Sequence, residues 1–139
     1  MKRKVCGDTV AVRLYPGEEL TAALKEVCEQ ERIVFGTVSG IGACDRAVTS
    51  IYNVEDKRYE DLCVEKRLEM VGLTGNISTK EGKVYLHLHA SFSDTEGTLF
   101  GGHLKEARIS ATGEIFLRRL PGAAERVLDE TTGLNVLDF

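Results

Sequence analysis

The sequence lacks a long apolar segment and any closely spaced pair of cysteines. No apolar run approaches the ~20 residues that a helix needs to cross a membrane, and no apolar segment follows the basic N-terminus as it would in a secretory signal. Four cysteines, at positions 6, 28, 44 and 63, form no CxxC pair. This spacing disfavours a four-cysteine zinc site and favours buried or half-buried thiols in the reducing cytoplasm.

The sequence also lacks a basic stripe. The formal net charge is −4 and the pI is about 5.4. Proteins that bind nucleic acid neutralise phosphates with clustered lysine and arginine. The densest basic segments, residues 2–4 and 118–119, are short and typical of a solvated surface. Composition therefore argues against tight DNA binding by one chain.

The first half of the chain contains one clear strand and one clear helix. The whole chain has 139 residues, 42% of them hydrophobic, which predicts a single domain over residues 1–139. Val10, Val12 and Leu14 alternate with polar residues, as in a half-buried strand. Apolar residues at helical spacing predict an amphipathic helix over residues 17–30. We predict two strands around a glycine-rich loop at residues 39–42, where the glycines indicate either tight backbone geometry or the close approach of another group.

The second half reads as strands joined by short turns. Two strands are predicted within residues 59–79, one over 83–93, and a long one over 104–120 with a bulge at Gly113. Residues 94–97 form a turn, and the tail after Pro121 is compatible with a short helix. The fold class predicted is α+β, a single compact domain with a largely antiparallel sheet and flanking helices.

All three histidines of the chain lie within residues 85–104. His87 and His89 are two apart on a predicted strand, so both project from the face that carries Tyr85. His103 follows Gly101 and Gly102 on the return strand. Three imidazoles with one open position form a known type of zinc site, and imidazole also suits copper, iron and nickel.

Two simpler interpretations of the histidines stay open. An HxH pair is also typical of an exposed polar strand face, and a histidine after two glycines can end a turn. No fourth ligand is evident from the spacing. Asp94 and Glu96 read as turn residues, and Glu69 reads either as an exposed strand carboxylate or as a partner that orients a metal-bound histidine.

Several blocks of the sequence occur together in an order that resembles one family. They are "RLYPGEELTAALKEVCEQERI", "GTVSGIGACDRA", "KRLEMVGLTGNIS", "VYLHLHASFSD", "FGGHL" and "TGEIFL". From about Val10 to Phe139 the chain resembles the plant-and-prokaryote-conserved (PPC) domain family. The resemblance implies a mostly antiparallel α/β domain, homotrimers among prokaryotic members, and metal ligands at His87, His89 and His103.

Members of this family are often labelled DNA-binding, and the sequence of this chain gives that label little support. Plant members attach the domain to Arg-Gly-Arg-Pro segments that bind the minor groove of DNA, and such a segment is absent here. Two functions remain. The first is a metal-binding, trimeric module, containing zinc or another transition metal, that recognises a small molecule or a partner, with a role in DNA-associated or transcriptional regulation. The second is a metal-dependent hydrolase or lyase acting on a small molecule, with Glu69 as an acid or base. A metal-free scaffold ranks third.

Overall fold

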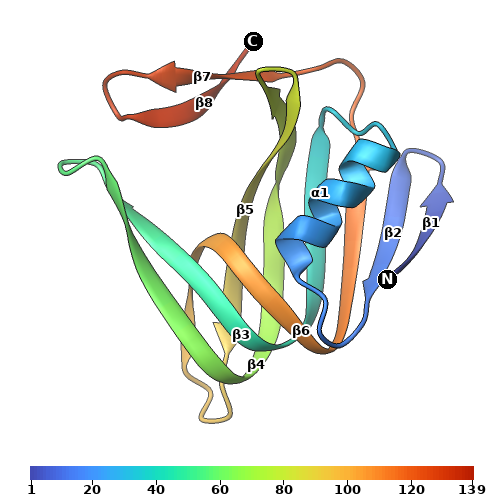
Figure 1. Ribbon diagram of the computed structural model, residues 1–139, viewed down its shortest axis with the longest axis vertical. Helices are drawn as coiled ribbons and strands as arrows, with labels where there is room; N and C mark the ends of the chain where they lie inside the picture. Colours follow the sequence, from blue (N-terminus) through green and yellow to red (C-terminus); the bar gives the residue numbers. More distant parts are fainter.

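Eight strands and one helix make up the structure, a computed structural model that describes residues 1–139 (Figure 1). In chain order they are β1 (Lys2–Cys6), β2 (Thr9–Leu14), α1 (Leu20–Gln30), β3 (Gly36–Asn53), β4 (Arg58–Lys80), β5 (Lys83–Ser93), β6 (Leu99–Arg119), β7 (Glu125–Asp129) and β8 (Leu134–Asp138). The largely antiparallel sheet is confirmed. The predicted flanking helices are wrong, since α1 is the single helix.

The four long strands pair in a closed ring. β3 pairs with β4 and β6, and β5 also pairs with β4 and β6, always antiparallel. β1 and β2 extend the sheet beyond β6, while β7 and β8 extend it beyond β4. The one parallel pairing joins β4 to β7 at Thr79 and Glu125. The ring brings β5 and β6, which carry the histidines, side by side.

β3 and β4 are each one continuous strand, so the predicted loop at residues 39–42 is wrong, and so is the predicted division of residues 59–79 into two strands. The glycines within residues 39–42 allow the backbone of β6 to approach β3 closely, which is one of the two roles that the sequence predicted for them. A Cβ on Gly40 would lie 2.8 Å from the carbonyl oxygen of Glu114, and one on Gly42 would lie 2.7 Å from that of Thr112. The strand therefore bends and shifts register here against β6 without breaking.

α1 begins at Leu20 because Glu19 caps it. The carboxylate of Glu19 accepts hydrogen bonds from the backbone N–H groups of Thr21 and Ala22, at 3.0 and 2.7 Å. These bonds satisfy N–H groups that lack a partner inside the helix. The helix lies across one face of the sheet (Figure 1) and buries Leu20, Leu24, Val27 and Cys28 completely.

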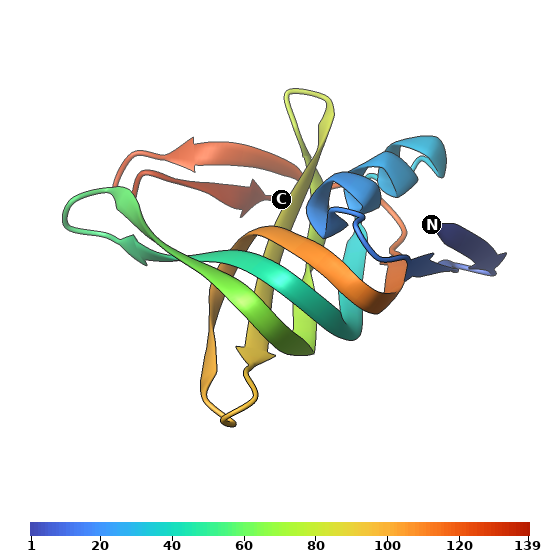
Figure 2. The same cartoon turned by 60° about the horizontal axis from the view of Figure 1, so that its bottom comes forward.

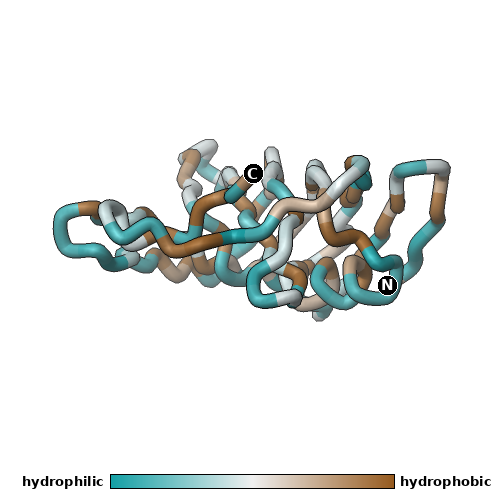
Figure 3. The backbone as a smooth tube through the Cα atoms, turned by 90° about the horizontal axis from the view of Figure 1, so that it is seen from above, coloured by the Kyte–Doolittle hydropathy of each residue, from teal (hydrophilic) through white to brown (hydrophobic).

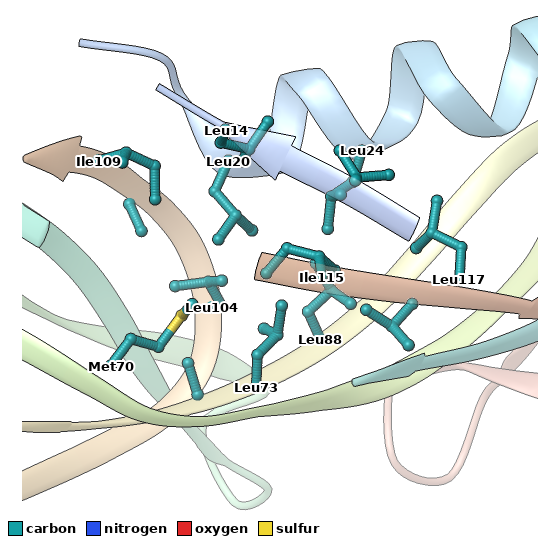
Figure 4. Close-up of a cluster of buried hydrophobic side chains, with 14 of the residues drawn as sticks. Leu14, Leu20, Leu24, Met70, Leu73, Leu88, Leu104, Ile109, Ile115 and Leu117 are labelled. Atoms are coloured by element: carbon teal, nitrogen blue, oxygen red, sulfur yellow. The ribbon is translucent and has the colours of Figure 1, made fainter. Parts of the chain in front are cut away.

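The core lies between α1 and the sheet. Figure 4 shows Leu20 and Leu24 of α1 packed against Leu14, Leu88, Ile115 and Leu117 of the sheet. Along the chain, hydrophobic and hydrophilic segments alternate instead of separating into an apolar and a polar end (Figure 3). Within β5, β6, the first part of β3 and the second half of β4, buried and exposed residues largely alternate, so one face lies in the core and the other outside it.

The tail forms a hairpin, β7–β8, and not the short helix that its sequence allowed. Thr79 donates its backbone N–H to the carbonyl of Ala124, which starts β7 against β4. The hairpin projects to the same side as the β3–β4 hairpin (Figure 2). Their tips are joined where the Tyr52 hydroxyl donates to the carbonyl of Thr132, at 2.7 Å.

The four cysteines are free thiols, two of which are not where the sequence predicted. Cys28 and Cys44 are buried, and burial raises the pKa of each thiol to about 12. Cys6 and Cys63 are exposed instead of half-buried, because both lie on strand segments with no covering layer. No helix is long and apolar enough to cross a membrane.

Candidate metal centre

The three histidines meet on the face of β5 and β6 that points away from the core. His89 lies directly opposite His103 in the pairing of β5 with β6, and His87 is two residues further along β5. Nε2 of His87 lies 3.2 Å from Nδ1 of His103. One ligand nitrogen from each ring lies within 4.8 Å of the others. The HxH geometry predicted from the sequence is confirmed.

Gly101 and Gly102 let β6 fit tightly between its two neighbours. A Cβ on Gly101 would lie 2.3 Å from the carbonyl oxygen of Ala90 in β5, and one on Gly102 would lie 2.5 Å from that of Ser50 in β3. Gly102 also has a φ of +154°, which L side chains rarely adopt. The two glycines therefore position His103 through the backbone, and not by clearing space for its side chain.

The environment keeps His87 and His103 neutral at neutral pH. Burial, then the positive charge of Arg126 and the two other imidazoles, lower the pKa of His87 to about 4. Burial and then His89 lower the pKa of His103. A metal binds the neutral form of imidazole, so His87 and His103 need no deprotonation at neutral pH.

Arg126 in β7 is the residue of this site that the sequence did not indicate. Its guanidinium donates to the Ser78 hydroxyl at 2.8 Å, to the Asn76 side-chain carbonyl at 2.6 Å and to the backbone carbonyl of Asn135 at 2.6 Å. Nη2 also lies 3.5 Å from Nδ1 of His87. Arg126 is 39 positions after His87 and directly follows Glu125 in a segment of mixed polarity, so no local pattern marked it.

A cavity of about 340 Å³ opens beside the histidines. Its floor is made by β4, β5 and β6, and its cover by β8. The lining side chains include Tyr59, Tyr85, His87, His103 and Arg126. The ring of Tyr59 meets that of His103 edge to face, with centroids 5.2 Å apart. The arrangement suits a small ligand that contacts His87 and His103, whereas His89 does not line the cavity.

The three acidic candidates lie away from the histidine cluster. Glu69 pairs with Ser93, four residues along β5 from His89, and its side chain is exposed. Asp94 is a turn residue that accepts from the backbone of Glu96 and Thr98 and pairs with a lysine. None of these carboxylates joins the metal-binding group of side chains. The structure therefore gives Glu69 no contact through which to orient a histidine.

The donor set fits a transition metal, with one adjustment at His87. A guanidinium only donates, so the contact with Arg126 needs an unprotonated Nδ1 on His87. A metal bound through Nε2 needs a proton on Nδ1, which would face the guanidinium N–H. The 3.5 Å contact is the longest that Arg126 makes, and the three shorter ones have other acceptors. Losing it costs little, and three imidazoles would hold the ion with a position left open.

The chain is a strand-dominated domain with one helix, and its three histidines lie on two paired strands. These features define its class as a small, sheet-based domain with a candidate metal centre. The chain belongs to the Plants and Prokaryotes Conserved (PCC) domain family, written PPC above, whose profile matches residues 1–121. Arg126 and the β7–β8 hairpin lie beyond the matched residues.

Two solved structures cover nearly the whole chain. A "putative DNA binding protein" from Bacteroides thetaiotaomicron is 30% identical, with a TM-score of 0.96 over 99% of this chain and 96% of that one. A metal-containing protein from Archaeoglobus fulgidus is 33% identical, with a TM-score of 0.88 over 99% and 97%. The fold is therefore common to relatives whose descriptions name DNA in one case and metal in the other.

Curated relatives are much longer than this chain. The bifunctional protein GlmU of Synechococcus sp. strain JA-3-3Ab is 32% identical over 108 residues, which are 76% of this chain but 16% of that protein. The similarity therefore concerns one segment of a larger protein.

Proposed function

We propose that the chain is a cytoplasmic, zinc-binding module that recognises a small molecule at the three-histidine centre. The observation that carries this proposal is the convergence of His87, His89 and His103 beside a cavity of about 340 Å³. Two of the imidazoles are held neutral by burial, which is the form that binds metal. The metal-containing relative from A. fulgidus supports the same assignment.

Metal content measured by elemental analysis tests the proposal. The protein is purified without a histidine tag or nickel resin and incubated with zinc. We expect about one zinc per chain, lost in His103→Ala and retained in the matched control Cys63→Ser, which removes an exposed thiol. Absence of bound metal after zinc incubation would refute the proposal.

We propose further that the module is a homotrimer. Support comes from an apolar patch on the outer face of neighbouring strands β3, β4 and β6. Ile41, Val71 and Phe116 are 57%, 51% and 51% exposed there. Exposed apolar patches of this kind mark association surfaces. Sedimentation should give a trimer mass for the wild type and a smaller one for Phe116→Glu, and a monomeric wild type would refute the proposal.

A regulatory role through direct DNA contact has the weakest support. Several surface cations are already neutralised, because Arg46, Lys105 and Arg108 each bond a carboxylate. Nucleic-acid binding depends on cations free to meet phosphates. We therefore expect no binding of duplex DNA in fluorescence anisotropy at physiological salt, and tight, salt-sensitive binding would reverse this view.

A metal-dependent hydrolase or lyase is the second candidate. The observation that favours it is the group of three histidines beside the cavity, which as ligands would leave a coordination position open. Zinc in such a site supplies an acidified water or polarises an oxygen of the substrate. The chain's own contribution is to hold neutral imidazoles at His87 and His103 and to place the substrate between them and β8. Turnover of a small ester or hydroxy acid that disappears with chelator and in His103→Ala would establish it, and a fourth protein ligand would exclude it.

A further inference from the structure

Arg126 is a buried cation without an acidic partner. It is 5% exposed, and no carboxylate forms an ion pair with it. Charged side chains are rarely buried unless an opposite charge compensates them. The other arginines that bond acids do so on the surface, where compensation matters less. The position of Arg126 therefore needs an explanation that the fold alone does not provide.

The neutral contacts of Arg126 hold the guanidinium rigid without neutralising it. Ser78, Asn76 and the backbone of Asn135 each accept one N–H, and the plane lies 4.8 Å from the ring centre of Tyr85. A guanidinium has five N–H donors, so these three bonds leave two. One of the two is directed toward His87 at 3.5 Å. The result is a preorganised cationic fork at the wall of the cavity.

The rest of the cavity carries no compensating charge. Arg126 is the one permanently charged residue of its lining. Tyr59 and Tyr85 add hydroxyl groups, and Leu134, Val136 and Leu137 of β8 add apolar surface. One cation beside an apolar wall complements a ligand with one negative charge and an apolar body. In the metal-free protein, a phosphate dianion would bring a second negative charge that nothing in the lining matches.

We propose that the cavity binds a small carboxylic acid, with its carboxylate on the guanidinium of Arg126 and its apolar part against β8. This inference rests on the proposed use of the cavity as a small-molecule site and names the chemical class of its ligand. The carboxylate would accept the two remaining N–H groups, one of them in place of the 3.5 Å contact with His87, in the planar two-bond geometry that guanidinium favours. The ligand would then lie within reach of the open position beside the three histidines.

Butyrate and its neutral amide, butyramide, are the probes. Each is titrated into wild-type protein labelled with ¹⁵N, once treated with chelator and once loaded with zinc, while the Nε–H signal of Arg126 and the backbone signal of Asn135 are followed. We expect butyrate to shift both signals and to bind at least about tenfold more tightly than butyramide, because a charged acceptor strengthens bonds from a cation. Equal affinities, or shifts confined to other residues, would overturn the proposal.

Variants separate recognition from a purely structural role of Arg126. Arg126→Gln should lose the preference for butyrate over butyramide, Arg126→Lys should keep part of it, and the matched control Arg118→Gln, an exposed site, should keep all of it. Circular dichroism checks that each variant folds. If Arg126→Gln does not fold, the butyrate and butyramide comparison in the wild type still decides. Inorganic phosphate binding more tightly than butyrate would also contradict the proposal.

The two metal states distinguish failure of this inference from failure of the proposed function. Butyrate binding at Arg126 in protein that takes up no zinc would support the carboxylate site while refuting the metal centre. Zinc uptake without any preference for butyrate over butyramide would support the metal centre while refuting the carboxylate site.

Discussion

The two faces of β5 differ in what covers them. On one face Leu88, Ala90 and Phe92 point into a core that α1 closes with fully buried apolar side chains. On the other, His87 lies beneath the β7–β8 hairpin beside a cavity of about 340 Å³. The helix excludes water almost completely, whereas the hairpin covers the sheet and leaves space.

This difference assigns stability to one face and ligand binding to the other. Burial of apolar surface beneath α1 supplies a large favourable term in folding. The hairpin instead buries a cation and half-buries imidazoles, which costs free energy unless a ligand compensates. Substitutions on the helix face should therefore act on stability, and those on the hairpin face on binding.

The largest expected effect is on the helix face. Leu24→Ala leaves a cavity beneath α1, where Leu24 is fully buried, and should lower the free energy of unfolding by about 2–5 kcal/mol. Urea unfolding measures the change. The matched control Leu99→Ala, at a site 67% exposed, should change it by less than about 0.5 kcal/mol. Equal effects at both sites would contradict the assignment of the core.

Gly102→Ala should lower both stability and zinc affinity, because Gly102 packs against the backbone of β3 and directly precedes His103. The new Cβ would collide with the carbonyl of Ser50, at 2.5 Å, and the φ of +154° would be strained. We expect a loss of about 1–3 kcal/mol in stability together with weaker zinc binding, since His103 is the next residue. Gly72→Ala is the control, because its Cβ would meet only the Ser91 hydroxyl at 3.4 Å. A Gly102→Ala protein with wild-type stability and zinc affinity would show that β6 does not need this close contact.

The pH dependence of stability should report on the hairpin face. The pKa of His87 is about 4 in the folded chain, below its ordinary value of 6.5. Between these values the unfolded chain takes up the proton first, so metal-free protein should lose stability as pH falls from about 6.5 toward 4, and regain it as pH rises. His87→Gln should flatten this part of the profile. Urea unfolding across that pH range measures both profiles. If the wild type and His87→Gln gave the same profile, His87 would not be held neutral.

The smallest expected effect is at Glu69. Its carboxylate is exposed and four residues along β5 from the register of His89. Glu69→Gln should leave zinc affinity unchanged in a competition assay with a chelator dye. Loss of tenfold or more, the effect typical of a residue that orients a metal ligand, would place Glu69 in the site after all.

The sequence predicts the local features of the site better than its long-range ones. The HxH pair follows from strand alternation, and α1 follows from helical spacing, since both patterns repeat over neighbouring residues. The tail differs because β7 is specified by its pairing with β4 and β8, which overrides the local preference of "GAAERVL". Arg126 could not be predicted for the same reason, as its role depends on contacts with residues 39 or more positions earlier. For Glu69 the sequence left two roles open, and the choice between them depends on the pairing of β4 with β5, which places Glu69 opposite Ser93 and not beside a histidine.

X-ray absorption at the zinc edge of the zinc-loaded protein tests the central claim most directly, namely that the hairpin face holds an open three-histidine metal centre. The account predicts three imidazole nitrogens at about 2.0–2.1 Å and one oxygen from water or added butyrate. Zinc bound to sulfur at about 2.3 Å, or closed by a fourth protein ligand, would contradict it.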